Sequence, residues 1–274
     1  MGALFGALSS LSVGVSEMFG RRGAKVTGVL AVCVVSQGVA AVAAFAMLLW
    51  LPSQPTWPDL GRGAVSGAGF GIGMVAYLGG LMRSSATVIA PMVATMTVVI
   101  PFGVAVAGGA EMTGLAALGV GVALVGLLFI TAGGRVGSGT LAGLLWGATS
   151  GFGYGVGLAA LIGTSSAGGS WPAVVQRLVA CLLTVVAALV VHSPVVPRGA
   201  VRWTALWSGV FGGLASVLYL LGIQADVLPA AVTGAMFPAI SVAIGRLVFG
   251  DSVRSVQLLG LGLVLAGVAG VVAG

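Results

Sequence analysis

Two stretches of the sequence decide the fold: "GVGVALVGLLFITAG", residues 119–133, and "GLGLVLAGVAGVVAG", residues 260–274. An offset of 141 places Gly119 on Gly260 and Gly126 on Gly267, and in each stretch the glycines recur every seven residues. Two helical turns nearly return to the same angle, so these glycines share one face of a helix. A face without side chains lets another backbone approach closely, which is how helices associate in lipid. We therefore expect this face of 119–133 to contact a glycine-rich helix, in particular its equivalent at 260–274.

The internal repeat extends over the whole chain. Near the start, Gly2, Ser9 and Gly14 align with Gly143, Ser150 and Gly155 at an offset of 141, and further on Ser66, Gly67 and Tyr77 align with Ser208, Gly209 and Tyr219 at an offset of 142. Self-similarity of this kind indicates that one structural unit occurs twice. The repeats are predicted at residues 1–134 and 138–274.

The composition indicates an integral membrane protein. Of 274 residues 59% are hydrophobic and only 6% are charged, whereas a soluble domain carries about a quarter charged residues. The first residues run directly into an apolar segment without a basic region before it, so we interpret them as a membrane span and not as a signal peptide. The formal net charge of +6 comes from scattered cations that indicate orientation and anionic lipid, and not nucleic acid.

Ten transmembrane helices are expected, five in each repeat. They are predicted at residues 2–19, 27–51, 64–82, 86–107, 114–133, 140–163, 172–192, 204–223, 228–249 and 256–274, because a span needs about 20 apolar residues. Only very tight turns fit between the third and fourth helices and between the eighth and ninth. With five helices in each unit, the second repeat must cross the membrane in the opposite orientation, and transporters built from such inverted repeats bind substrate between the halves.

At this point the sequence resembles the drug/metabolite transporter superfamily, specifically its EamA-type ten-helix members. The resemblance rests on "GALSSLSVGVSEMFG" (6–20), "VIAPMVATMTVVIP" (88–101) and "PAAVTGAMFPAISVAIGRLVFGDSVRSVQLLG" (229–260). In the second half Pro238 precedes Asp251 by thirteen residues, close to the usual arrangement of the family, whereas Pro101 precedes Glu111 by only ten. The resemblance implies a plasma-membrane (inner-membrane), multi-pass exporter of a small organic metabolite or drug-like solute, and not an enzyme.

Arg177 and Gln37 are the leading candidates for substrate binding. Arg177 lies about two turns into a predicted helix, and at an offset of 140 its repeat partner is Gln37, so both halves place a long polar side chain at one depth. Two such residues indicate a cavity wall, since lipid does not satisfy polar groups. The alternative is an arginine that extends to the membrane surface.

Three further residues are weaker candidates. Tyr77 and Tyr219 offer a ring and a hydroxyl that could bind a ligand, although tyrosines at a membrane interface are common. Glu17 follows the serines of the first helix and could carry a proton if buried; the alternative is an ion pair with Arg21 four residues on. Glu111 and Asp251 begin the last helix of each half, where the helix dipole favours a negative charge.

The remaining motifs exclude several classes of protein. No Walker A, G-x-S-x-G or H-E-x-x-H sequence occurs, and the isolated Cys33 and Cys181 suit neither a zinc site nor a disulfide framework. We expect no catalytic residues, cofactor or metal. A small-molecule substrate and membrane lipid are the expected partners, with no nucleic acid, while proton coupling and a homo-oligomer stay open.

Orientation and the rival functions also stay open. Nine cations fall in one set of alternating loops and one in the other, which places both termini outside the cytoplasm, whereas the resembled family is drawn with cytoplasmic termini. The rival functions are a flippase for a lipid-linked head group, with Arg177 on a phosphate, and a membrane scaffold that transports nothing.

Overall fold

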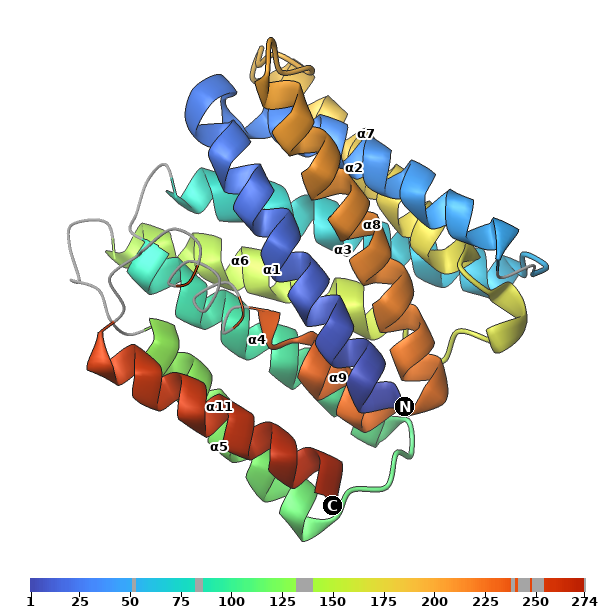
Figure 1. The fold of residues 1–274 in the computed structure, drawn as a ribbon, viewed down its shortest axis with the longest axis vertical. Helices are drawn as coiled ribbons and strands as arrows, with labels where there is room; N and C mark the ends of the chain where they lie inside the picture. Colours follow the sequence, from blue (N-terminus) through green and yellow to red (C-terminus); the bar gives the residue numbers. More distant parts are fainter. Residues whose placement is uncertain are drawn as a thin grey trace.

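The protein is an assembly of helices in a computed structural model that describes residues 1–50, 53–81, 86–131, 140–237, 240, 247 and 254–273 (Figure 1). The helices are α1 (Gly2–Thr27), α2 (Val29–Ala46), α3 (Trp57–Leu81), α4 (Ala86–Ala107), α5 (Gly114–Thr131), α6 (Thr140–Ala160), α7 (Trp171–Val190), α8 (Val201–Ala225), α9 (Val227–Gly234) and α11 (Ser255–Ala273), with short 3-10 turns at Met47–Leu49 and Ser166–Gly168. Every regular element within the described residues is helical, which confirms the predicted all-α class. Most of the predicted ninth helix beyond α9, together with Pro238, Arg246 and Asp251, lies outside the described residues.

Several helices extend past the ends of the apolar segments that predicted them. α1 continues to Thr27 and not to residue 19, because hydropathy marks where a span leaves lipid and not where a helix breaks. The break falls at Gly28, whose φ of 87° suits glycine and turns the chain directly into α2. α3 begins at Trp57, seven residues before the predicted span. The tight turn between α8 and α9 is confirmed, since Asp226 alone separates them.

The first turn of α5 corrects the expectation for Glu111. That residue is exposed and lies three positions before the helix, which begins at Gly114. Thr113 caps the helix instead, since its hydroxyl accepts a hydrogen bond from the amide of Ala116 at 3.1 Å. A side-chain oxygen directly before the first turn reaches the free amides, whereas a carboxylate further back does not.

The described helices include five that are long and apolar enough to cross a membrane: Gly2–Ala24, Val29–Leu49, Trp171–Val190, Val201–Ala225 and Ser255–Ala273. Two shorter apolar helices, Met92–Ala107 and Gly114–Phe129, accompany them. The outer surface agrees with this, because large apolar side chains of α7 such as Leu178, Leu182 and Leu189 are more than half exposed. These features indicate a membrane-embedded protein.

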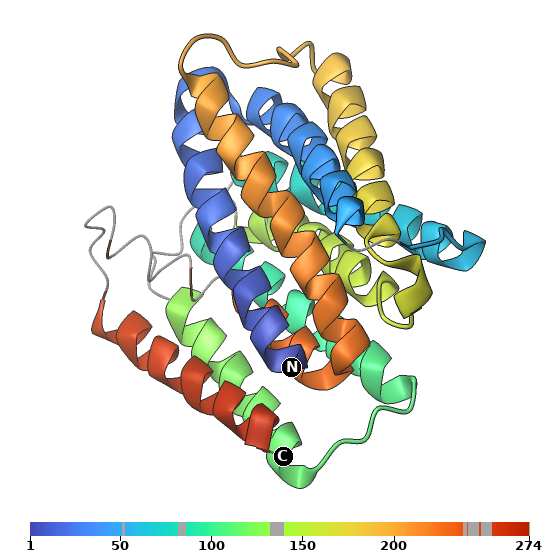
Figure 2. The same ribbon diagram turned by 45° about the vertical axis from the view of Figure 1, so that its right-hand side comes forward.

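The two halves of the chain pack mainly on each other. α1 lies along α8 and also contacts α9, while α3 lies along α6 and α6 also contacts α4. α2 packs on α7 and α8, and α3 packs on α7. Figures 1 and 2 show α1 beside α8, with α2 and α7 next to them. The residues 1–134 and 138–274 therefore do not form two separate bodies.

Equivalent positions of the repeat contact each other in both halves. The Ser66 hydroxyl of α3 donates a hydrogen bond to the carbonyl of Gly157 in α6. At the equivalent positions the direction is reversed, since the Ser16 hydroxyl of α1 donates to the backbone carbonyl of Ser208 in α8 at 2.7 Å. A Cβ atom added at Gly67 would lie 2.5 Å from the carbonyl oxygen of Gln176, and one added at Gly209, the equivalent position, 2.6 Å from that of Ser36. The backbones of α3 and α7 are thus in close contact, and those of α8 and α2 are in close contact at the matching positions.

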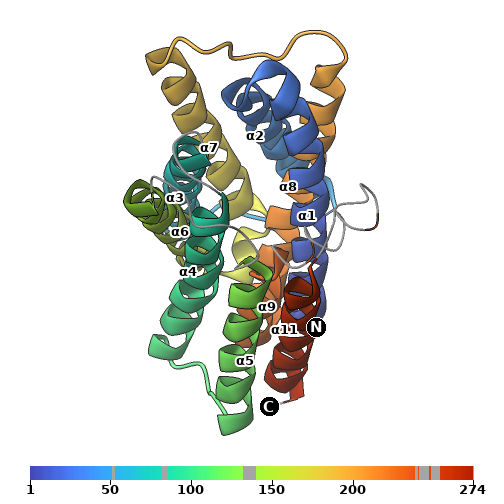
Figure 3. The same cartoon turned by 90° about the vertical axis from the view of Figure 1, so that its left-hand side faces the viewer.

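Helices that are equivalent in the repeat pack on each other: α2 on α7, α5 on α11, and α4 on α9. Near the start of α7, Ser170 donates a hydrogen bond to the carbonyl of Ala44 near the end of α2, at 3.3 Å, so α7 and α2 run antiparallel. α5 and α11 are also antiparallel, since Gly119 faces Gly267 and Gly126 faces Gly260. Figure 3 shows this second pair at one end of the molecule, below α1 and α4.

The α5–α11 contact confirms the glycine prediction for the described residues. A Cβ atom added at Gly126 would lie 2.6 Å from the amide nitrogen of Val264 and 2.7 Å from the carbonyl oxygen of Gly260. One added at Gly267 would lie 2.5 Å from the carbonyl oxygen of Gly119. We refer to Gly119, Gly126, Gly260 and Gly267 as the glycine seam; Gly133 and Gly274 lie outside the described residues.

A polar clamp holds the beginning of α3 to the loop between α6 and α7. The carboxylate of Asp59 accepts hydrogen bonds from the Thr56 hydroxyl at 2.6 Å, from the Ser165 amide at 3.0 Å and from the Ser165 hydroxyl. Arg62 donates to the carbonyl of Ile162 in the same loop. Burial alone raises the pKa of Asp59, but these hydrogen bonds and the charge of Arg62 outweigh it, so the pKa lies below its ordinary value.

Candidate functional site

Arg177 lies in the interior between α2, α3, α7 and α8. Its side chain is only 8% exposed, because α7 directs its small and polar residues inward and its leucines outward. The guanidinium donates three hydrogen bonds: from Nε to the Ser216 hydroxyl at 2.8 Å, from Nη1 to the Gln37 side-chain oxygen at 2.9 Å, and from Nη2 to the Gly212 carbonyl at 2.7 Å. The arginine is therefore held in the interior and does not extend to the membrane surface, which corrects that alternative.

The two residues predicted from the repeat contact each other. Gln37 of α2 accepts the hydrogen bond from Arg177, 140 positions later, and its amide donates to the Met74 sulfur of α3 at 3.3 Å. Met74 and Ser216 are themselves equivalent at an offset of 142. Gln37 thus contacts α3 at the position where Arg177 contacts α8. The acceptor is a sulfur in the first half and a hydroxyl in the second.

A second row of polar groups supports the first. The Ser216 hydroxyl donates to the side-chain oxygen of Gln176 at 2.6 Å, and the Gln176 amide donates to the Ser66 hydroxyl at 2.7 Å. Ser66 in turn donates to the carbonyl of Gly157. The chain of hydrogen bonds joins α7, α8, α3 and α6, and a satisfied buried network of this kind rigidifies its surroundings.

Aromatic rings cover another side of the guanidinium. The centroid of the Phe70 ring lies 5.5 Å from the Arg177 carbon Cζ, within range of a cation–π interaction. Phe70 also packs edge-on against Tyr154 of α6, with ring centroids 5.4 Å apart. Glu17, Tyr77 and Arg177 lie in the neighbourhood of Tyr154.

The other predicted site residues differ in their surroundings. Glu17 is partly buried in α1 and Tyr77 partly buried in α3, both within electrostatic range of Tyr154. Tyr219 lies in an apolar cluster with Leu220 and Ile223 and is 2% exposed. Its hydroxyl makes no hydrogen bond within the part of the chain that the structure describes. The predicted alternative, an ion pair of Glu17 with Arg21, is not tested, because the side chain of Arg21 is not among those that the structure describes.

Sequence reasoning missed four groups that contact Arg177 or support its partners: Gln176, Ser216, Phe70 and the Gly212 carbonyl. A signal for Gln176 was present, since the adjacent pair Gln176–Arg177 aligns with the pair Ser36–Gln37. Phe70 and the carbonyl of Gly212 carried no signal, because an apolar ring and a backbone oxygen look the same at any position of an apolar helix.

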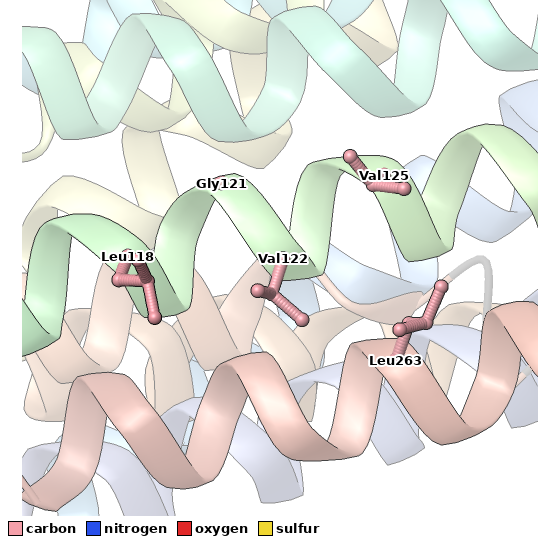
Figure 4. A pocket seen from close by; sticks show the side chains of 5 residues that line it. All are labelled: Leu118, Gly121, Val122, Val125 and Leu263. Carbon is pink, nitrogen blue, oxygen red and sulfur yellow. The ribbon is translucent and has the colours of Figure 1, made fainter.

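A shallow hollow on the outside of the α5–α11 pair is a poor candidate for a solute site. Figure 4 shows its lining, which consists of Leu118, Gly121, Val122 and Val125 of α5 and Leu263 of α11. Leu118 is 67% exposed and Val125 46% exposed. All five residues are apolar, so nothing there would orient a polar solute.

Comparisons with known proteins define the fold alone. Neither a family model nor a curated protein matches the sequence. Solved structures do match, and one of them, described only as "Crystal structure of protein", aligns with a TM-score of 0.81 over 98% of this chain and 95% of that chain, at 15% sequence identity. The helical architecture therefore occurs in a protein of very different sequence, and the function must be argued from the site.

Proposed function

We propose that this protein is a secondary transporter of a small organic solute, an EamA-type member of the drug/metabolite transporter superfamily, in the plasma membrane. It would export its substrate by alternating access between two inverted five-helix repeats, ten transmembrane helices in all. Such transporters bind substrate where the repeats meet. Arg177 and Gln37 would form that site, with no cofactor and no enzymatic step.

One observation carries this proposal: the repeat-related residues Arg177 and Gln37 donate and accept one hydrogen bond, 2.9 Å long, in the interior of a protein with only 6% charged residues. Residues equivalent in two repeats meet only near the axis that relates the repeats. Buried charged groups in membrane proteins are costly and are usually functional. The site is therefore both central to the repeat and chemically unlike its surroundings.

The antiparallel pairs support the inverted arrangement. α7 is the repeat equivalent of α2 and runs against it, and α11 does the same with α5. A repeat inserted in the same direction would place these helices parallel. Glu17, within electrostatic range of Tyr154, would exchange protons with one side of the membrane in this proposal.

Reconstitution into proteoliposomes tests the proposal. Counterflow of labelled metabolites is expected with the natural chain, and loss of that flux with Arg177→Gln. Gly121→Ala is the matched control, because Gly121 faces open space on α5 and the change should leave the flux intact. Equal flux through the natural chain and Arg177→Gln would contradict the proposed site, and movement of labelled lipid alone would favour the flippase.

Proton coupling has a separate test. Glu17→Gln removes the titratable group but keeps the size of the side chain. The variant should retain substrate binding and lose the dependence of flux on a pH gradient. An unchanged dependence in this variant would exclude Glu17 as the coupling residue.

A further inference from the structure

Within the described part of the chain, the charge of Arg177 is not balanced by an acidic hydrogen-bond partner. All three groups that accept its hydrogen bonds are neutral: a hydroxyl, a carboxamide and a backbone carbonyl. No ion pair of Arg177 occurs among the described residues. Asp59 is held in the clamp at the beginning of α3, and Asp226 is exposed between α8 and α9. The hydrogen bonds of the guanidinium go to α2 and α8 and not to α1, which carries Glu17. A buried charge without a partner of opposite charge destabilises the folded protein.

The guanidinium also has N–H groups that donate to no acceptor among the described residues. It has five N–H groups, and the structure uses three of them, one each on Nε, Nη1 and Nη2. One N–H therefore remains on each terminal nitrogen. Carboxylates and phosphates accept hydrogen bonds from such pairs of N–H groups in a bidentate manner.

We infer that Arg177 binds the anionic group, a carboxylate or a phosphate, of the solute that this protein transports. The inference rests on the transport function proposed above and names its substrate class. Gln37 and Ser216 fix the guanidinium, Phe70 lies beside it, and the anion supplies the negative charge that the protein lacks at this place. The bound anion would remove the cost of the buried charge, so it should stabilise the folded protein.

Thermal unfolding of the purified protein in detergent tests the inference. The probes are benzoate, succinate and inorganic phosphate, with benzamide and succinamide as neutral controls of the same shape. At least one anion is expected to raise the unfolding temperature, and neither amide should do so. Arg177→Gln should weaken the apparent affinity for that anion by about tenfold or more.

A second variant keeps the test valid if Arg177→Gln does not fold. Gln37→Glu places a carboxylate where the carboxamide oxygen now lies, 2.9 Å from Nη1, and so supplies an internal counter-ion. This variant should stay folded and lose the stabilisation by added anions. Gly121→Ala should respond as the natural chain does.

The outcomes separate the inference from the transport proposal. Equal stabilisation by carboxylates and amides, or stabilisation by anions that survives in Gln37→Glu, would overturn the anion site. Transport of a neutral or cationic solute that requires Arg177 would overturn it as well and leave the transporter standing. Anion binding through Arg177 without flux of any probe would leave the site and overturn transport.

Vesicles of two lipid compositions distinguish a free solute from a lipid headgroup as the source of the anion. Vesicles of phosphatidylcholine are compared with vesicles that also contain phosphatidylglycerol. Stabilisation by the soluble probes in phosphatidylcholine identifies a free solute. Stabilisation that appears only with phosphatidylglycerol and requires Arg177 identifies a lipid headgroup, and stabilisation in neither would overturn the inference.

Discussion

The glycine seam and the Gln37–Arg177 contact are two places where a helix meets its own repeat equivalent. In the seam the equivalent residues are identical, since Gly119 corresponds to Gly260 and Gly126 to Gly267. Because the two helices are antiparallel, Gly119 lies opposite Gly267 and Gly126 opposite Gly260. At the other contact the equivalent residues differ, with a carboxamide on α2 and a guanidinium on α7. One region keeps the symmetry of the repeat and the other breaks it.

The physical demands of the two regions explain the difference. Close backbone contact needs small residues on both helices, so a change on either side is costly. A single buried charge needs unlike residues at the two equivalent positions. Two arginines would repel each other, and two glutamines would carry no charge. Identical residues therefore belong to packing here, and unlike residues belong to the chemistry of the site.

The largest effect is expected from Gly126→Leu. Its Cβ alone would lie 2.6 Å from the amide nitrogen of Val264, and the helices cannot separate without losing the rest of their contact. We expect a loss of about 3 kcal/mol or more in the free energy of unfolding, measured by denaturation in mixed micelles. Gly121→Leu is the control, because a Cβ atom added at Gly121 meets nothing within 4 Å; equal destabilisation by both would refute the seam.

Gln37→Arg would restore symmetry at the contact that breaks it. The new guanidinium would lie beside that of Arg177, with no carboxylate to separate the charges. We expect a loss of about 2 to 3 kcal/mol, somewhat below the cost of breaking a buried ion pair, in the same denaturation assay. Gln37→Glu should be at least as stable as the natural chain; a lower stability of Gln37→Glu than of Gln37→Arg would contradict the positive character of the site.

Ser216→Ala tests the asymmetric partner of Arg177. The change removes the acceptor for Nε and the donor to Gln176. A loss of about 1 to 2 kcal/mol is expected, because buried polar groups are left without partners. Ser12→Ala is the matched control, since among the described residues the Ser12 hydroxyl donates to the Leu8 carbonyl of its own helix and to no other helix; the thermal unfolding temperature should separate the two variants.

The smallest effect is expected at the clamp, which also exists in one half only, because the position equivalent to Asp59 is Val201. The hydrogen bonds and Arg62 hold the pKa of Asp59 below its ordinary value. The carboxylate therefore stabilises the fold above the unfolded pKa of about 4, and this contribution is lost as the pH falls below that value. Asp59→Asn should cost about 1 kcal/mol at neutral pH and progressively less on acidification; a difference independent of pH would contradict the clamp.

The sequence predicted the helices and the seam because both depend on patterns that a single helix carries. Apolar length defined most of the segments, and glycine spacing defined the packing face that α5 and α11 use. The last residue of α1 and the first residue of α3 were predicted wrongly, because the length of an apolar segment does not show how far its helix continues outside the membrane. Glu111 was misplaced for a related reason, since the cap depends on local backbone geometry at Thr113.

The site was predicted only where the repeat exposed it. Gln37 and Arg177 could be paired because each lies at the same depth in equivalent helices. That they meet directly follows from the packing of α2 on α7, and no spacing within one helix encodes it.

By itself, then, the sequence determined an apolar, duplicated, helical protein with a charged group at matching depth in one of two equivalent helices. Only the tertiary structure decided that this charge is buried among neutral acceptors, with Ser216, Gly212 and Phe70 around it. The reason is physical: hydropathy and helical period are properties of one chain segment, whereas the balance of a buried charge depends on groups that four helices bring together.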